Sequence, residues 1–240
     1  MKIIGVIPSR YASTRFPGKP LADILGKPMI WWVYNKAIEV KEIDEVVVAT
    51  DDKRIFDVCK KYELNVIMTS DKHNTPTDRL YEVSTKVEGD IFVFIGGDEP
   101  LIEPEAIRAL VPINDVDEMY VANAMTTIKT APEVIDFTNI KVVVNDEGYG
   151  LYTSRSPIPY PKGGLNYDYK KFVGIGAFSK KALEFFHNTP KSKLEKIEEC
   201  DLIRFIENGI KIKFINVECR NISVDTKKDL EKVIELMKNK

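Results

Sequence analysis

The segment Lys2-Ile3-Ile4-Gly5-Val6-Ile7-Pro8 runs directly into Ser9-Arg10-Tyr11-Ala12-Ser13-Thr14-Arg15-Phe16-Pro17-Gly18-Lys19-Pro20. The apolar first part predicts a buried strand. Loops that follow the carboxyl ends of strands are where open α/β sheets bind ligands. Arg10, Arg15 and Lys19 offer charge-assisted donors, and Gly18 lets the backbone come close to a ligand. This loop therefore favours a polyphosphate site over an ordinary exposed basic loop.

Composition narrows the classes of function. The 240 residues are 44% hydrophobic and 30% charged, enough for one large α/β domain or a domain with a lobe. A formal net charge of -2 argues against a broad nucleic-acid or anionic-membrane surface. No apolar run is long enough for a membrane span, and strand residues at the start predict no signal peptide. Scattered cysteines at 59, 200 and 219 predict reduced thiols in a cytoplasmic protein, and two histidines exclude a His-rich metal centre.

The first half of the chain alternates between two hydrophobic patterns. This alternation predicts a mostly parallel central sheet with helices on both faces. Strands are expected at 3–7, 46–50, 65–68, 91–95 and 120–125, and helices at about 28–40, 53–62, 78–87 and 104–111.

The second half has a different character. We expect one domain over residues 1–240, with an inserted β-rich lobe at about 126–178. The expected elements are a hairpin at 139–152, a Pro/Gly-rich loop at 157–164, a strand at 172–178, a helix at about 192–208 ended by Gly209, a strand at 210–217 and a last helix from Asp225-Thr226.

Two carboxylates each lie at a predicted junction between a strand and a helix. Asp98 follows Gly96-Gly97, and Asp225 precedes the last helix. Magnesium prefers carboxylate oxygens together with substrate phosphates and water. Taken alone, each Asp is better explained by a turn or a helix cap. Only the two together make a magnesium site a hypothesis worth holding.

Two further segments each allow two interpretations. Residues 73–80 place hydroxyl side chains before a helix, where they either bind a nucleobase, ribose or phosphate, or only cap the helix, with Arg79 on a solvated face. Arg155 lies beside a Pro-constrained loop with aromatic residues, where it either holds an acidic or hydroxyl-rich acceptor or makes an ordinary ion pair. No G-x-x-x-x-G-K-[ST] loop or G-x-G-x-x-G fingerprint follows the first strand, which argues against P-loop kinases and hydride-transfer enzymes.

Together, the segments Pro8–Leu21, Gly97–Pro100, Tyr152–Pro159 and Val224–Thr226 resemble the 3-deoxy-manno-octulosonate cytidylyltransferases, or CMP-KDO synthetases. The segments at 192–198 and 207–209 also match, and the order along the chain is that of the family. The resemblance implies a glycosyltransferase-A-like nucleotidyltransferase fold and usually a homodimer, with the β-rich lobe at about 126–178 serving acceptor binding and dimerisation. It also implies that CTP and an acid sugar give a CMP-sugar and pyrophosphate, with magnesium as cofactor.

The resemblance further implies roles for individual residues. The catalytic residues would be Lys19, Arg10, Asp98 and Asp225, of which the two Asp bind the metal. The nucleotide would be bound by Pro8, Ser9, Arg10, Ser13, Arg15, Lys19, Thr75, Thr77, Asp78, Arg79, Gly97 and Asp98. The acceptor would be bound by Gly96, Arg155, Tyr160, Phe172, Gly176, Glu198 and Asp201, with Arg155 facing its carboxylate.

Several positions depart from the family pattern. Gly96 stands in place of the usual Gln, Phe172 and Gly176 in place of His and Tyr, Leu202 in place of Gln, and Thr75-Pro76-Thr77 in place of Ser-Gly-Thr. Most of these positions face the sugar in the family, and polar groups left unpaired by a wrong ligand discriminate strongly. The expected acceptor is therefore KDO or a related 2-keto acid sugar. The alternatives are a nucleotidyltransferase with another acceptor or nucleotide, and a non-catalytic nucleotide-binding relative.

Overall fold

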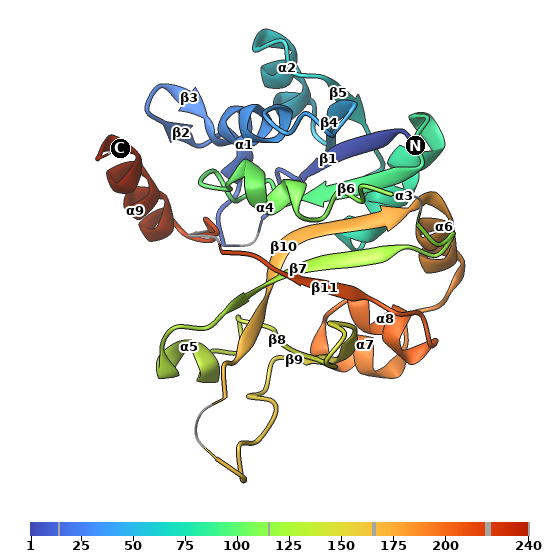
Figure 1. The fold of residues 1–240 in the computed structure, drawn as a ribbon. Coiled ribbons are helices and arrows are strands. Elements are labelled where there is room, and N and C mark those ends of the chain that lie inside the picture. The colour runs from blue at the N-terminus through green and yellow to red at the C-terminus, as the bar shows by residue number, and fades with distance from the viewer. Residues whose placement is uncertain (14, 115, 165–166, 219–221, 240) are drawn as a thin grey trace.

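One mixed sheet organises the chain (Figure 1). The computed structural model describes residues 1–13, 15–114, 116–164, 167–218 and 222–239. The strand order of the sheet is β11 (Lys213–Asn216), β7 (Val121–Thr127), β10 (Lys170–Ser179), β6 (Ile91–Ile95), β1 (Ile3–Ser9), β4 (Glu45–Thr50) and β5 (Val66–Met68).

Most neighbouring strands along this order are parallel. Pairing is parallel for β1 with β4 and β6, for β4 with β5 and for β7 with β11, whereas β10 runs antiparallel to β6 and β7. The predicted α/β fold is confirmed, and within this order β10 makes the sheet mixed.

The first strand is buried on both faces, because its alternate side chains enter two different cores. Ile3 and Ile7 pack in one core, and Ile4 and Val6 pack in the other. The first core is covered by α1 (Met29–Ile38), α2 (Lys53–Lys61) and α4 (Pro104–Arg108). The second is covered by α3 (Pro76–Lys86), α6 (Lys180–Asn188) and α8 (Leu202–Glu207).

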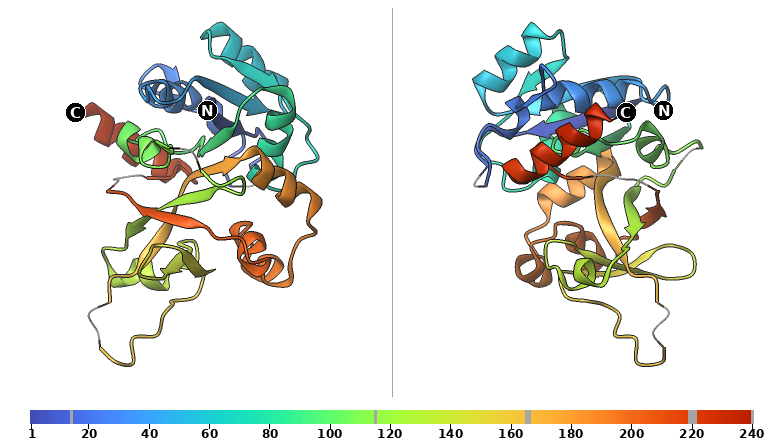
Figure 2. Two further views of the ribbon diagram at one scale, coloured as in Figure 1. Left: turned by 45° about the vertical axis from the view of Figure 1, so that its right-hand side comes forward. Right: turned by 90° about the vertical axis from the view of Figure 1, so that its left-hand side faces the viewer.

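A small lobe lies below the main sheet in Figure 1. The predicted hairpin forms from β8 (Lys141–Val144) and β9 (Gly150–Ser154), and β8 pairs with the first residues of β10. The short helix α5 (Ala131–Ile135) precedes the hairpin. The described residues 155–164, which follow β9, extend away from the rest of the chain in all views (Figures 1 and 2).

The predicted helix at 192–208 is two helices. α7 (Lys193–Glu198) is followed by Glu199, whose φ of 49° is left-handed, and α8 begins at Leu202. A left-handed residue cannot continue an α-helix, so the chain changes direction there. The helix α6, which no prediction covered, begins at the cap Ser179. The structure also ends α4 and β11 earlier than predicted, and Cys219 lies outside the described residues.

The last helix packs against the beginning of the chain. α9 (Lys227–Lys238) begins with the predicted capping box between Thr226 and Asp229. Its buried Val233 packs in a small core with Ile24 and Met29, which belong to the β2 (Asp23–Ile24) and β3 (Lys27–Pro28) hairpin region and to α1. This packing holds the residues just before α9 close to the 3-10 turn η1 (Lys19–Leu21). Within the described residues, no helix has the length and apolarity needed to cross a bilayer.

We expect Val233→Ala to lower the free energy of unfolding by about 2 kcal/mol, because it removes buried methyl groups and leaves a cavity. Urea denaturation measures this change. Leu236→Ala on the same helix, where the side chain is 42% exposed, is the matched control and should have a much smaller effect. Equal effects of the two substitutions would contradict the docking of α9.

Candidate active site

The ends of β1 and β6 meet at one edge of the sheet. Because the two strands are parallel neighbours, the loops that follow them leave the sheet side by side. A Cβ atom at Gly97 would lie 2.9 Å from the Pro8 carbonyl oxygen and 3.1 Å from Ser9 Oγ. Glycine is therefore required at position 97 for these two loops to approach one another.

A cluster of opposite charges joins three distant segments at this edge. Lys19 Nζ lies 2.7 Å from Asp98 Oδ2 and 3.5 Å from Asp225 Oδ1. Arg15 Nη2 lies 3.0 Å from Asp225 Oδ1. The Lys19 side chain is only 14% exposed, so its attraction to the two carboxylates is screened less than on an open surface. The structure thus brings together both predicted metal ligands and two predicted phosphate-binding cations.

The two carboxylates suit a magnesium ion. Their oxygens already converge on one cationic group, the Lys19 ammonium. Among the described residues, no three His, Cys, Asp or Glu side chains gather into a metal cage. Magnesium is commonly bound by one or two carboxylates plus substrate phosphates and water, so two Asp fit this type of site.

The phosphate-loop candidate folds around Tyr11. The amides of Ser13 and Gly18 both donate to the Tyr11 carbonyl oxygen at 2.9 Å. Gly18 has a φ of 72°, which a glycine adopts without strain. The Arg54 guanidinium lies 3.3 Å from the centre of the Tyr11 ring. These contacts fix the loop just before Lys19. Arg10, at the start of the loop, is exposed.

The start of α3 combines capping with a contact to the cavity. Thr75 and Asp78 form a capping box, so both side chains serve the helix end. Thr77 Oγ1 donates to Asp201 Oδ2 at 2.5 Å, and Thr77 and Asp201 both line the main cavity. Burial raises the pKa of the Asp201 carboxyl, although its hydrogen bond from Thr77 opposes this effect.

Arg79 corrects the expectations for this segment. Its side chain is 2% exposed, Nη2 lies 2.7 Å from Asp51 Oδ2, and Nη1 donates to Thr69. The guanidinium is neither on a solvated face nor lining the main cavity. Arg79 is therefore an internal support that joins α3 to the segment after β4, not a direct contact to a nucleotide.

The main cavity has a volume of about 1420 Å³ and is charged at both ends. One end has the metal-site residues Asp98 and Asp225, together with Arg15. The far end, toward the lobe, has Lys129, Glu133, Arg155 and Lys171. The middle is largely apolar, with Phe94, Gly96, Ile140, Phe172, Gly174, Phe178 and Leu202.

The Arg155 guanidinium is already engaged by backbone carbonyl groups. Nε donates to Glu198 O at 2.7 Å, Nη1 to Phe137 O at 3.0 Å and Nη2 to Glu199 O at 3.3 Å. Glu198 does not line the cavity, because its carboxylate accepts from Ser154 Oγ at 2.6 Å and Arg155 N at 2.8 Å. Arg155 and Glu198 therefore fasten β9 to the break between α7 and α8. Arg155 also lines the cavity, and the contacts of both residues with an acceptor stay predictions.

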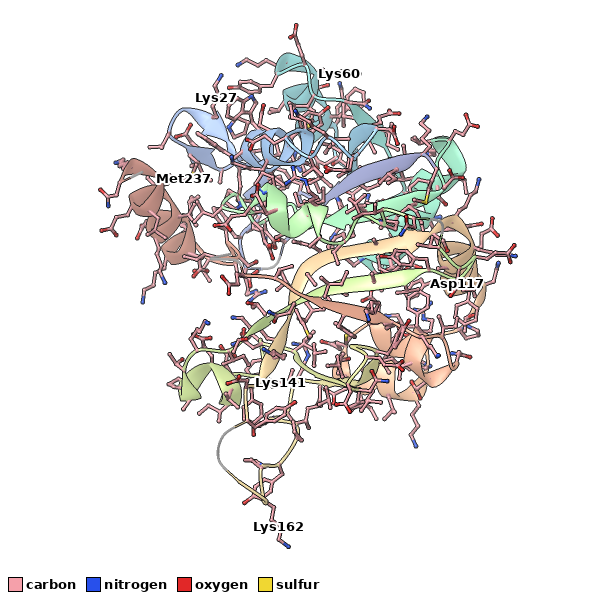
Figure 3. The ribbon with its side chains drawn as sticks, viewed as in Figure 1. Lys27, Lys60, Asp117, Lys141, Lys162 and Met237 are labelled. Carbon is pink, nitrogen blue, oxygen red and sulfur yellow. The ribbon has the colours of Figure 1, made fainter. Side chains whose placement is uncertain are left out.

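A buried lysine supports the same wall of the cavity. Lys141, labelled in Figure 3, is fully buried, and its Nζ donates to Asp136 O at 2.9 Å and Asn139 O at 2.6 Å. Burial lowers the pKa of this amine. Together with Arg155, it holds the carbonyl groups of Asp136, Phe137 and Asn139, and part of this loop lines the cavity.

Other expected acceptor residues lie in different places. Gly96, Phe172 and Asp201 line the cavity. Tyr160 does not: it is 85% exposed in the loop between β9 and β10, whose Lys162 projects far from the sheet in Figure 3. Gly176 is buried within the sheet, paired with both Phe94 and Asn123.

The structure adds cavity residues that the sequence analysis missed. Asn123 and Glu99 are 1% and 7% exposed, and both line the cavity. Glu99 Oε1 lies 2.8 Å from where a Cβ of Gly174 would be, so this glycine makes room for the carboxylate. An amide within the apolar strand residues Val121-Ala122-Asn123-Ala124-Met125 is the available sequence signal, because buried polar groups need partners.

Comparison with known proteins gives similarity over the whole chain. Residues 4–212 match the family model described as cytidylyltransferase. The chain is 42% identical over 237 residues to a 3-deoxy-manno-octulosonate cytidylyltransferase of Escherichia coli, with 98% of this chain and 96% of that protein covered. It is 40% identical over 251 residues to the protein of the same name from Geobacter sulfurreducens, with 99% and 100% covered.

Solved structures agree with this similarity. A CMP:2-keto-3-deoxy-manno-octonic acid synthetase complexed with CTP superposes with a TM-score of 0.93 at 41% identity, covering 100% of this chain and 99% of that one. A cytidylyltransferase from Leptospira borgpetersenii has a TM-score of 0.67 at 18% identity, covering 100% and 88%, which shows a shared fold alone.

We expect Arg79→Met to lower the free energy of unfolding by about 3 kcal/mol, because Asp51 then lacks the partner of its buried charge. Lys53→Met, which breaks the exposed pair with Asp57, is the control and should cost well under 1 kcal/mol. Chemical denaturation measures both. In the folded variant, CTP affinity should stay near the wild-type value. A large loss of CTP affinity with unchanged stability would restore Arg79 as a nucleotide contact.

Proposed function

The chain belongs to the 3-deoxy-manno-octulosonate cytidylyltransferase family, and we propose that it transfers CMP from CTP to KDO or a related 2-keto acid sugar, with release of pyrophosphate. The observation that carries the proposal is the cluster of Lys19, Asp98 and Asp225 at the ends of β1 and β6. This cluster combines cations for phosphate oxygens with carboxylates for a metal. It opens on a cavity of about 1420 Å³, large enough for a nucleotide and a sugar together.

The proposed reaction is an in-line displacement at the α-phosphorus. A hydroxyl oxygen of the acceptor forms a bond to this phosphorus, the bond to the bridging oxygen of pyrophosphate breaks, and the hydroxyl proton is released. Catalysis of this kind consists mostly of positioning and charge stabilisation. Lys19, Arg15 and Arg10 would neutralise the phosphate oxygens and the leaving pyrophosphate.

Asp98 and Asp225 would hold magnesium, and their convergence on a single ammonium group supports this assignment. When bound, the ion supplies positive charge to the phosphate oxygens of CTP. Lys19 stays beside the two carboxylates because its side chain is mostly buried. A fixed cation at this place orients the triphosphate along the sheet edge.

The far end of the cavity suits an acidic acceptor. Because Arg155 is engaged by three carbonyl groups, the cations that we assign to the acceptor carboxylate are Lys129 and Lys171. Lys171 Nζ lies 3.3 Å from Asn139 Oδ1 and 3.8 Å from Glu133 Oε2, contacts that leave it able to take a stronger partner. Thr77, Pro76 and Asp201 would line the path between nucleotide and sugar.

We also propose a homodimer formed through the lobe and a cytoplasmic location. The lobe exposes apolar side chains at Ile135, Phe137, Leu151 and Tyr160, the kind of surface that a second copy covers. Cys59 and Cys200 are buried free thiols, in keeping with a reducing compartment. Burial raises the pKa of Cys59 to about 12 and that of Cys200 to about 11, so both thiols should stay unreactive.

The substrate proposal predicts pyrophosphate release from CTP that requires both magnesium and an acid sugar. The measurement is a coupled pyrophosphate assay with KDO and other 2-keto acid sugars, repeated with UTP and GTP. CTP should be preferred because the whole chain is similar to cytidylyltransferases. Binding of CTP without turnover on any acceptor would favour a non-catalytic relative instead.

The metal proposal predicts that Asp98→Ala lowers kcat by about 1,000-fold, because charge on the reacting phosphate is no longer offset. Asp57→Ala is the control, since Asp57 lies on the exposed face of α2 and pairs only with Lys53 among the described residues. Both variants should keep the wild-type circular dichroism spectrum. Near wild-type turnover by Asp98→Ala would show that the metal is held elsewhere.

A further inference from the structure

Asn123 places an amide group at the floor of the main cavity. The residue lies in β7 and is 1% exposed, yet it lines the cavity. Its Nδ2 donates to Ala124 O at 2.8 Å and to Val173 O at 3.1 Å. These bonds fix the orientation of the amide, because a flipped group would set Oδ1 against two carbonyl oxygens.

The other half of this amide, Oδ1, accepts no hydrogen bond from the residues that the structure describes. Buried side-chain oxygens in proteins nearly always have a donor, and an exception needs an explanation. Here the explanation lies in the cavity, because Asn123 is one of its lining residues. A donor supplied by a ligand would complete the amide.

Gly176 leaves a gap in the row of side chains beside Asn123 Oδ1, where a ligand can approach this oxygen. Phe94 on β6, Gly176 on β10 and Asn123 on β7 pair directly across the three strands, so their side-chain positions share one face. Phe94 and Asn123 both line the cavity, and Gly176 has no side chain between them. A Cβ atom at Gly176 would lie 3.0 Å from Asn123 Oδ1 and 3.0 Å from Phe178 Cε2, so it would crowd both the amide oxygen and the Phe178 ring.

The aromatic side chains around Asn123 Oδ1 make a hydrogen bond to this oxygen selective for a ligand that carries a donor. Phe94 and Phe178 flank the gap, and Phe178 lies two residues after Gly176 on the same face of β10. An acceptor that lacks the donor leaves this amide oxygen without its ligand partner.

We propose that Asn123 is a specificity-determining residue, whose Oδ1 accepts a hydrogen bond from an O–H or N–H group of the acid-sugar acceptor. Gly176 keeps this atom accessible. The inference rests on the proposed function, because it assigns the acceptor end of that same cavity. It defines the substrate class as acid sugars with a hydroxyl or acylamino donor directed at β7.

The test compares kcat/KM for KDO, its 4-, 5-, 7- and 8-deoxy analogues, and N-acetylneuraminate as an acylamino acid sugar. We expect wild type to discriminate against the acceptor that lacks the donor by at least about 10-fold. Asn123→Leu should abolish this discrimination and leave the KM for CTP unchanged. If the donor is an N–H group, Asn123→Leu should lower kcat/KM most for N-acetylneuraminate. If the donor is an O–H group, Asn123→Leu should lower kcat/KM most for KDO.

A second variant keeps the amide and its two donated bonds. Gly176→Ala should lower kcat/KM for the acceptor by about 10-fold, because its Cβ crowds Oδ1. Gly163→Ala is the matched control, since a Cβ there meets no described atom within 4 Å. If Asn123→Leu does not fold, Gly176→Ala decides alone: an unchanged acceptor kcat/KM overturns the inference.

Other outcomes separate this inference from the proposed function. If Asn123→Leu lowers kcat/KM equally for every acceptor, Asn123 has a structural role. If it lowers kcat/KM for none of them, water pairs with the amide oxygen. Either result overturns the inference while the cytidylyltransferase activity stands. A wild-type protein that transfers CMP to no acid sugar overturns the proposed function, and the inference with it.

Discussion

Asp98 and Asp225 share the ammonium of Lys19, and the rest of the structure serves to bring these three groups together. Two carboxylates at one place repel each other unless a cation lies between them. Asp98 reaches the place from the end of β6, Lys19 from the turn after the β1 loop, and Asp225 from the start of α9. The packing of α9 on the β2–β3 region and α1 is what brings a residue near the end of the chain to this edge.

Under the proposed function, the cavity separates the charge chemistry at the phosphates from recognition of the acceptor. At the sheet edge, fixed cations and carboxylates suit a triphosphate with its metal ion. In the middle, aromatic side chains and glycines surround the isolated amide oxygen of Asn123. The lobe supports the far wall through Arg155 and Lys141, which bind the carbonyl groups of Asp136, Phe137 and Asn139. Under the proposed function, a change of acceptor would leave the phosphate end undisturbed.

Local patterns predicted the parts of the structure that depend on local interactions. The apolar run of β1, the alternation of strands and helices and the capping box at Thr226 follow from neighbouring residues. The burial of Arg79 could not be foreseen, because it depends on Asp51, which lies 28 residues away. The same holds for the left-handed break at Glu199 and for the carbonyl partners of Arg155, which come from separate segments. Asn123 was missed because its meaning arises only beside Gly176 on the neighbouring strand.

The joint action of the two carboxylates is the central claim, and calorimetric titration of CTP tests it most directly. Wild type and Asp225→Asn would each be titrated with and without magnesium. We expect magnesium to strengthen CTP binding to wild type by about 10-fold or more, and we expect this coupling to be largely lost in Asp225→Asn. An unchanged magnesium effect in Asp225→Asn would show that Asp225 does not hold the metal and pairs only with Lys19 and Arg15.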